Sequence, residues 1–179
     1  MIKKEITKVS FVKSCEEYPE LDCIGEYTEK LSDGVIVRRF TEFYEKLTEE
    51  QKRNIPSNSR ECRFFKPYAG GEKFGTDEYY EYGMQDYRRA EDYNNGGWCY
   101  LVVHAEAEVI TPGNSFPPSG LINTIKSGCL GGIESDSDQA YFDEVKREEL
   151  DELRVALVSF GFTNRQISKA FEDVEEVSK

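Results

Sequence analysis

Apolar and polar positions alternate with the period of a strand in some stretches of the 179-residue chain and with that of a helix in others. The clearest stretch is 98–110, where every second side chain is apolar and the remaining ones turn from apolar to polar. Successive side chains of a strand point to opposite faces, so this pattern predicts a central strand with one fully buried face. Shorter β-prone runs predict further strands at 6–13, 23–30, 35–39, 62–66 and 121–127.

Helical spacing and capping residues predict two long helices and a shorter one at the end of the chain. Thr76 precedes a helix at 77–93, and a cluster of Ser and Asp precedes a helix at about 138–160. Thr163-Asn-Arg-Gln166 has the form of a capping box, and it opens a last amphipathic helix that we expect to include Val174.

Turn residues complete the expected organisation. Asp33-Gly34 lies between the runs 23–30 and 35–39 and predicts a hairpin, because both residues tolerate a positive φ. Thr41 is placed to cap a short helix, and the proline-rich stretch 111–120 predicts a long turn that leads back along the central strand.

With most strands before the helices, the chain is expected to be an α+β protein. We predict a single domain over 1–179, with a mainly antiparallel twisted sheet, helices packed on one side of it, and a C-terminal helical pair within a segment at about 138–177.

The formal net charge of −12 changes this picture by limiting the partners. Residues 1–90 carry a net −2 and residues 91–179 a net −10. An acidic surface repels phosphate groups, so direct nucleic-acid binding is not expected. Such a surface can meet a basic groove on a protein partner, or it can simply keep the protein soluble; the charge alone leaves both roles open.

The five cysteines and the apolar runs indicate the compartment. The cysteines are odd in number and form no C-x-x-C pair, and the chain starts without a secretory signal, so reduced thiols in a cytoplasm are expected. No apolar run approaches the ~20 residues that span a bilayer, so no membrane association is expected. One histidine and scattered cysteines favour neither a zinc site nor a bound cofactor.

Carboxylates are the main candidates for a functional site. Glu134, Asp136 and Asp138 follow one another at alternate positions before the helix at 138–160, and Glu106 and Glu108 are expected beside them on the central strand. Oxygen ligands in this number suit a hard metal ion, which gives the alternative of a metal-dependent phosphoesterase. Acids in this place also serve as N-caps and as partners of the helix dipole.

Other motifs are incomplete or ambiguous. His104-Ala-Glu106 has the H-x-E form of zinc deaminases without the P-C-x-x-C that must follow. We expect it to be the solvated end of a half-buried strand. Tyrosines crowd the stretch 79–100 with Arg88 and Arg89 among them, a composition that suits a partner interface, with Tyr87 and Trp98 as contact candidates, or an aromatic core.

Several segments together carry a resemblance to a known family. They are Gly25–Thr28, Arg63–Phe65, Asp86–Arg89, Asn94–Cys99, Ala105–Val109 and Ser127–Asp138. Over about 23–160 the chain resembles a widespread family of small phage and plasmid proteins, in which the hairpin usually ends Ser-Gly-Gly-Leu-Trp-Gly-Ile-Glu-Ser-Asp before an acidic helix. The chain departs from this pattern at Cys129 and Gly131, where the family more often has Gly and Trp.

The resemblance implies an accessory gene of a phage or another mobile element that enters a bacterial cell. Small acidic proteins of such elements often act on host defence, and CRISPR inhibitors are among them. The leading hypothesis is therefore a non-catalytic protein that binds a host defence nuclease, a CRISPR effector being favoured, in the host cytoplasm. The phosphoesterase or nuclease remains the alternative, and a subunit of the phage particle or replication machinery is a third reading.

Overall fold

The computed structural model describes residues 4–17, 19, 23–55, 64–112 and 120–179. The chain divides into two compact units, one made of 1–17 and 99–179 (unit 1) and the other of 18–98 (unit 2). Unit 2 is thus an insertion between the first strand of unit 1 and the rest of it. The sequence indicated a single domain over 1–179, and its pattern carried no sign of this division.

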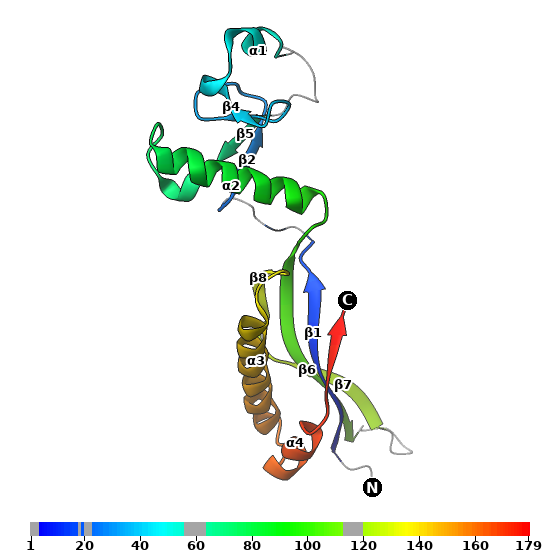
Figure 1. Cartoon of the computed structure of the whole chain (residues 1–179). Coiled ribbons are helices and arrows are strands. Elements are labelled where there is room, and N and C mark those ends of the chain that lie inside the picture. The colour runs from blue at the N-terminus through cyan, green and yellow to red at the C-terminus, as the bar shows by residue number, and fades with distance from the viewer. Residues whose placement is uncertain (1–3, 18, 20–22, 56–63, 113–119) are drawn as a thin grey trace. The chain divides into compact units, whose positions relative to one another are not determined.

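Unit 1 is an antiparallel sheet with one added parallel strand and two helices (Figure 1). β6 is its centre: β1 pairs along one edge of β6, while β7 and then β8 pair along the other edge. β9 runs parallel to β1 on its far side. The elements are β1 (Glu5–Cys15), β6 (Tyr100–Pro112), β7 (Gly120–Lys126), β8 (Leu130–Glu134), α3 (Gln139–Ser159), α4 (Asn164–Ala170) and β9 (Val174–Ser178).

The helices of unit 1 cover one face of this sheet, as Figure 1 shows. Of the alternating apolar positions of β6 that the sequence singled out, those from Val103 to Val109 are buried, and Val103, Ala105 and Ala107 are fully inaccessible to solvent. Ala105 and Ala107 pack with Leu153 and Leu157 of α3 in one cluster. Val103 packs with Phe142 and Val145 in a second. The α+β class, the central strand and the helix-covered face are confirmed.

The end of the chain differs from expectation. The capping box forms, since Thr163 Oγ1 accepts from the backbone N–H of Gln166, but α4 ends at Ala170. Val174, expected on the helix, begins β9 and pairs with Val9. The apolar positions 170, 171 and 174 have the spacing of a helix, and all three pack against the core. Val174 nevertheless pairs with the edge of β1, a partner that the spacing of apolar residues cannot reveal.

Unit 2 holds a small antiparallel sheet in the order β2-β5-β3-β4, with α2 packed on it. Phe65 of β5 contacts Tyr87 of α2, with ring centroids 5.6 Å apart, and Phe43 of β4 contacts Tyr80 at 4.9 Å. The elements are β2 (Gly25–Thr28), β3 (Ile36–Val37), β4 (Glu42–Phe43), η1 (Tyr44–Lys46), α1 (Glu49–Arg53), β5 (Phe64–Pro67), η2 (Ala69–Gly71) and α2 (Asp77–Asn94).

Two predictions for unit 2 are wrong. β2 and β3 do not form a hairpin, because β5 lies between them and pairs with both; Phe65 is opposite Tyr27 on one side and Ile36 on the other. Thr41 does not cap a helix but has a positive φ of 52°, and the short helix α1 begins later, capped by Thr48. The predicted cap of α2 at Thr76 is confirmed. Parts of the predicted strand at 62–66 and of the turn at 111–120 lie outside the described residues.

Candidate functional site

The segment Ser127–Asp138, in which the sequence analysis placed several candidate acids, connects β7 through β8 to α3. Its first residue, Ser127, lies just after β7, where the regular strand pairing with β6 stops, and it forms two hydrogen bonds with β6 across this gap. The backbone N–H of Ser127 donates to the carbonyl of Ala105 at 2.9 Å, and the backbone N–H of Ala105 donates to the Ser127 hydroxyl at 2.9 Å. β8 then resumes the ladder opposite Val103. Ser127 therefore has a structural role, because it holds the chain to β6 in the gap between β7 and β8.

The hydroxyl of Ser127 also donates to the carboxylate of Glu149, a buried acid on the inner side of α3. Burial raises the pKa of Glu149, the hydrogen bond from Ser127 lowers it, and the nearby charge of Glu152 raises it again, with a net upward shift. Glu152 in turn accepts from the backbone N–H of Gly128 at 3.1 Å. Two acids of α3 thus hold the backbone at the break in place.

The second half of the segment is equally structural. The Ile133 side chain lies in the core against Phe11, and Ser135 continues the ladder, its N–H donating to the Cys99 carbonyl at 2.8 Å and its hydroxyl accepting from the Cys99 N–H at 2.9 Å. Asp138 caps α3 by accepting from the Tyr141 N–H at 2.8 Å. Ser127, Ser135 and Asp138 accordingly satisfy backbone N–H groups where the chain passes from strand to helix.

The predicted acidic residues fall into two groups. Glu134, Asp136 and Asp138 lie together at the turn between β8 and α3, where Asp136 and Asp138 are exposed. Glu106 and Glu108 are not beside them. Glu134 pairs with Tyr100, six residues before Glu106 on β6, which corresponds to about 20 Å along a strand. The expectation that the five carboxylates form one surface is therefore corrected. The four that the phosphoesterase alternative would use, Glu106, Glu108, Glu134 and Asp136, do not converge on one ion.

Glu106 is neutralised by its neighbours. Its carboxylate lies 3.3 Å from His104 Nε2, 3.5 Å from Lys126 Nζ and 3.6 Å from Lys179 Nζ. Burial opposes ionisation, but the hydrogen bond with His104 and the charges of the two lysines outweigh it, so the pKa of Glu106 is lowered. His104 itself is buried and not the solvated residue that its strand pattern suggested. Glu108 accepts a hydrogen bond from the Thr7 hydroxyl at 2.9 Å.

Tyr87 and Trp98 are buried, with 4% and 3% of their surface exposed. The Trp98 indole N–H donates to the Arg89 carbonyl at 3.0 Å, and the Arg89 guanidinium lies 3.7 Å from the centre of the ring. Tyr87 packs on Phe65. Their proposed role as exposed partner contacts is wrong; the aromatic-core reading describes these two rings.

The structure adds an acidic stripe that the sequence reasoning missed. Glu144, Glu148 and Asp151 have the spacing i, i+4, i+7 and are exposed on the side of α3 opposite its buried residues. Arg147 lies 3.6 Å from Glu144 and Arg154 2.6 Å from Asp151, so only part of this negative charge is balanced on the helix. The helical period of these acids was the signal that could have found them.

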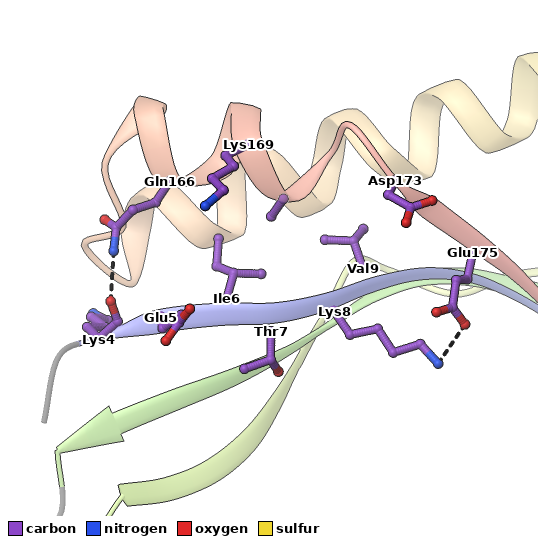
Figure 2. A pocket seen from close by; sticks show the side chains of 11 residues that line it. Lys4, Glu5, Ile6, Thr7, Lys8, Val9, Gln166, Lys169, Asp173 and Glu175 are labelled. Carbon is purple, nitrogen blue, oxygen red and sulfur yellow. Dashed lines mark hydrogen bonds and ion pairs between the residues drawn. The ribbon is translucent and has the colours of Figure 1, made fainter.

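A hollow of about 490 Å³ lies beside the start of β1. Figure 2 shows the side chains that line it. The parallel pairing with β9 begins only at Val9, so residues 5–8 of β1 pair on one side only among the strands described. The hollow has lysines and acids on its walls; Lys8 forms an ion pair of 2.8 Å with Glu175, and Gln166 donates to the Lys4 carbonyl at 2.7 Å. Its charges are mixed, and the lining does not indicate one kind of ligand.

Comparisons of the chain with protein-family models, curated proteins and solved structures found no match. Among the residues that the structure describes, no group of three or more His, Cys, Asp and Glu side chains is placed to hold a metal ion. In the same residues, no helix combines the length and the apolar character needed to cross a membrane.

Proposed function

We propose that this protein is an accessory protein of a phage or another mobile element, which binds and inhibits a host defence nuclease without catalysis. The favoured partner is a CRISPR effector, which the protein would bind in the cytoplasm of the host cell. Such effectors hold nucleic acid in basic channels, where an acidic protein surface can take the place of the phosphate backbone.

The surface that we assign to this binding is the α3 acidic face, made of Asp136, Asp138, Glu144, Glu148 and Asp151. All five are exposed and lie on one helix or in the turn before it. An ion pair that stays partly hydrated avoids most of the desolvation cost of a buried pair, so exposed carboxylates can contribute to encounter and register. Glu106 is left out of the face, because its charge is already balanced by Lys126 and Lys179 and it lies within hydrogen-bond distance of His104.

The observation that carries the proposal is the sign of the whole charge distribution. Unit 1 has eighteen Asp and Glu against eleven Lys and Arg, and unit 2 has seventeen against twelve, so that the net charges are −7 and −5. Both units are therefore acidic, and the contrast between the two halves of the sequence is weaker between the two units. A protein of this charge is attracted to basic grooves over distances of about a Debye length, ~8–10 Å in physiological salt.

The test is inhibition of DNA cleavage by a panel of purified, guide-loaded RNA-guided nucleases at several salt concentrations. The test variant is Glu144→Gln, Glu148→Gln and Asp151→Asn together, which removes three charges and keeps the size of each side chain. We expect its half-inhibitory concentration to rise at least about tenfold, equivalent to about 1.4 kcal/mol. Inhibition by the unchanged protein should weaken as salt increases.

The matched control combines Glu50→Gln, Glu78→Gln and Glu81→Gln. These are three exposed acids of unit 2, and their loss changes the net charge by the same amount. It should inhibit like the unchanged protein. Equal weakening of the two triple variants would remove the α3 acidic face from the proposal. Absence of binding and inhibition with every nuclease of the panel, even at about 50 mM salt, where the Debye length is about 10–15 Å, would overturn the function itself.

A further inference from the structure

Two of the cysteines, Cys15 and Cys99, meet at one end of the sheet of unit 1. Cys15 is the last residue of β1 and pairs with Leu101 of β6. The Glu16 N–H donates to the Tyr100 carbonyl at 2.8 Å, so the ladder continues one step further and Cys99 lies diagonally across from Cys15. Residues two apart on a strand share a face, so both thiols point to the same side, and they are hydrogen-bonded to each other.

This thiol pair sits where the chain leaves unit 1 and returns to it. Unit 2 starts at Tyr18, three residues after Cys15, and ends at Trp98, immediately before Cys99. A covalent bond between the two sulfurs would therefore close the whole segment 16–98 into a loop. No other pair of cysteines in the sequence encloses unit 2 so closely.

We propose that Cys15 and Cys99 are a redox-active pair that a peroxide converts into a disulfide. The Cys15 thiol, after losing its proton to solvent, attacks hydrogen peroxide; a sulfenic acid forms on Cys15 and one water leaves. The Cys99 thiol then displaces the sulfenic oxygen, which leaves as a second water, and the S–S bond forms. The dithiol is oxidised by two electrons and the peroxide is reduced to water.

The surroundings of the two sulfurs suit these roles. Cys15 is exposed and open to the oxidant, whereas Cys99 is partly covered and lies within reach as the resolving thiol. The hydrogen bond with Cys99, together with burial, raises the pKa of Cys15, so the reaction should be slow at neutral pH and accelerate as the solution becomes alkaline.

Geometry also bears on the stability of the bond. Diagonal neighbours in an antiparallel pair have α-carbons about 7–8 Å apart, at or beyond the upper end of the distances that disulfides span. The strand ends must approach slightly as the bond closes. An exposed bond of this kind is open to attack by other thiols, so we expect dithiothreitol to reverse it readily.

The experiment treats the full chain with hydrogen peroxide, blocks remaining thiols with iodoacetamide and maps tryptic peptides without reduction. Trypsin leaves Cys15 and Cys23 on one peptide, so the mapping is done with Cys23→Ser as the background; Cys99 is the only cysteine of its own tryptic peptide. We expect a linked pair of these two peptides, a loss of two free thiols per chain, and recovery of both thiols with dithiothreitol. Formation should be faster at pH 9 than at pH 7.

Cys15→Ser and Cys99→Ser should each abolish the link, and Cys129→Ser, which removes an exposed cysteine elsewhere in unit 1, should leave it unchanged. The mapping of the background protein stands even where a variant is destabilised. The proposal is wrong if Cys15 and Cys99 stay alkylatable at peroxide concentrations that oxidise Cys129. It is equally wrong if Cys15 proceeds to sulfinic acid without a link, or links to another chain.

Discussion

The hydrogen bond between Ser127 and Glu149 gives a quantitative prediction about the family-like motif. Ser127→Ala removes the acceptor of the Ala105 N–H and the hydroxyl donor of a carboxylate that is only 7% exposed. A hydrogen bond to a charged group contributes about 1.5–3 kcal/mol, and an unsatisfied buried N–H costs about 1–3 kcal/mol. We expect the free energy of unfolding to fall by about 3 kcal/mol at pH 7.

Glu149→Gln separates the charge from the hydrogen bond. The amide oxygen of the new glutamine can still accept from the Ser127 hydroxyl, so we expect the free energy of unfolding at pH 4 to change by no more than about 1 kcal/mol. The pKa of Glu149 is raised in the folded protein, so the stabilisation linked to its protonation is complete below the unfolded pKa of about 4.3 and is lost as the pH rises through the folded pKa. The stability of Glu149→Gln relative to the unchanged protein should therefore increase from pH 4 to pH 7.

The assay is urea unfolding followed by far-ultraviolet circular dichroism for the two single variants and the double variant, at both pH values. At pH 7 the double variant should lose about 1–2 kcal/mol less than the two separate losses predict, because no ionised carboxylate is then left without its donor. At pH 4 this coupling should shrink. A loss below about 0.5 kcal/mol for Ser127→Ala, or the same coupling at both pH values, would refute the reasoning.

Two further predictions concern packing in unit 2 and charge in unit 1. Gly83→Ala would place a Cβ 2.9 Å from side-chain carbons of Phe43 and Pro67, so the free energy of unfolding in urea should fall by about 1–3 kcal/mol despite the better helix propensity of alanine. The control Gly131→Ala, whose new Cβ would have its nearest neighbour at 3.8 Å, should cost less. Equal costs would contradict the packing argument. The pKa of Glu106 is lowered, so the stability that its ionised form contributes is present above the unfolded pKa and is lost as the pH falls through the folded pKa. Glu106→Gln should therefore lower the free energy of unfolding at pH 7 and approach the unchanged protein in acid. A difference that does not depend on pH would count against the ion-pair account.

Local patterns were sufficient for the elements whose partners lie nearby in the chain. The caps of α2 and α3 at Thr76 and Asp138 form because a side-chain oxygen reaches a backbone N–H three residues on, an interaction that the sequence spells out directly. The strand β6 was recognisable because one of its faces packs in the core, which keeps every second side chain apolar, while the other face turns from apolar to polar along the strand.

Patterns failed where a distant segment supplies the partner. The Asp33-Gly34 turn looked like a hairpin because turn residues encode only the local bend, and the later strand β5 separates β2 from β3. Val174 looked helical because its spacing from Ile167 and Ala170 fits a helix, and it is β1, more than 150 residues earlier, that pairs with it.

The candidate site shows the same division. The sequence by itself determined the α+β class, the negative charge, the acids before α3 and the thiols that carry the redox proposal, because composition and short-range spacing depend on nothing else. Only the tertiary structure decided that Glu106 lies about 20 Å from Glu134, that Tyr87 and Trp98 are buried, and that Cys15 meets Cys99. Strand register and burial depend on pairing between segments far apart in the chain, and no local pattern contains that information.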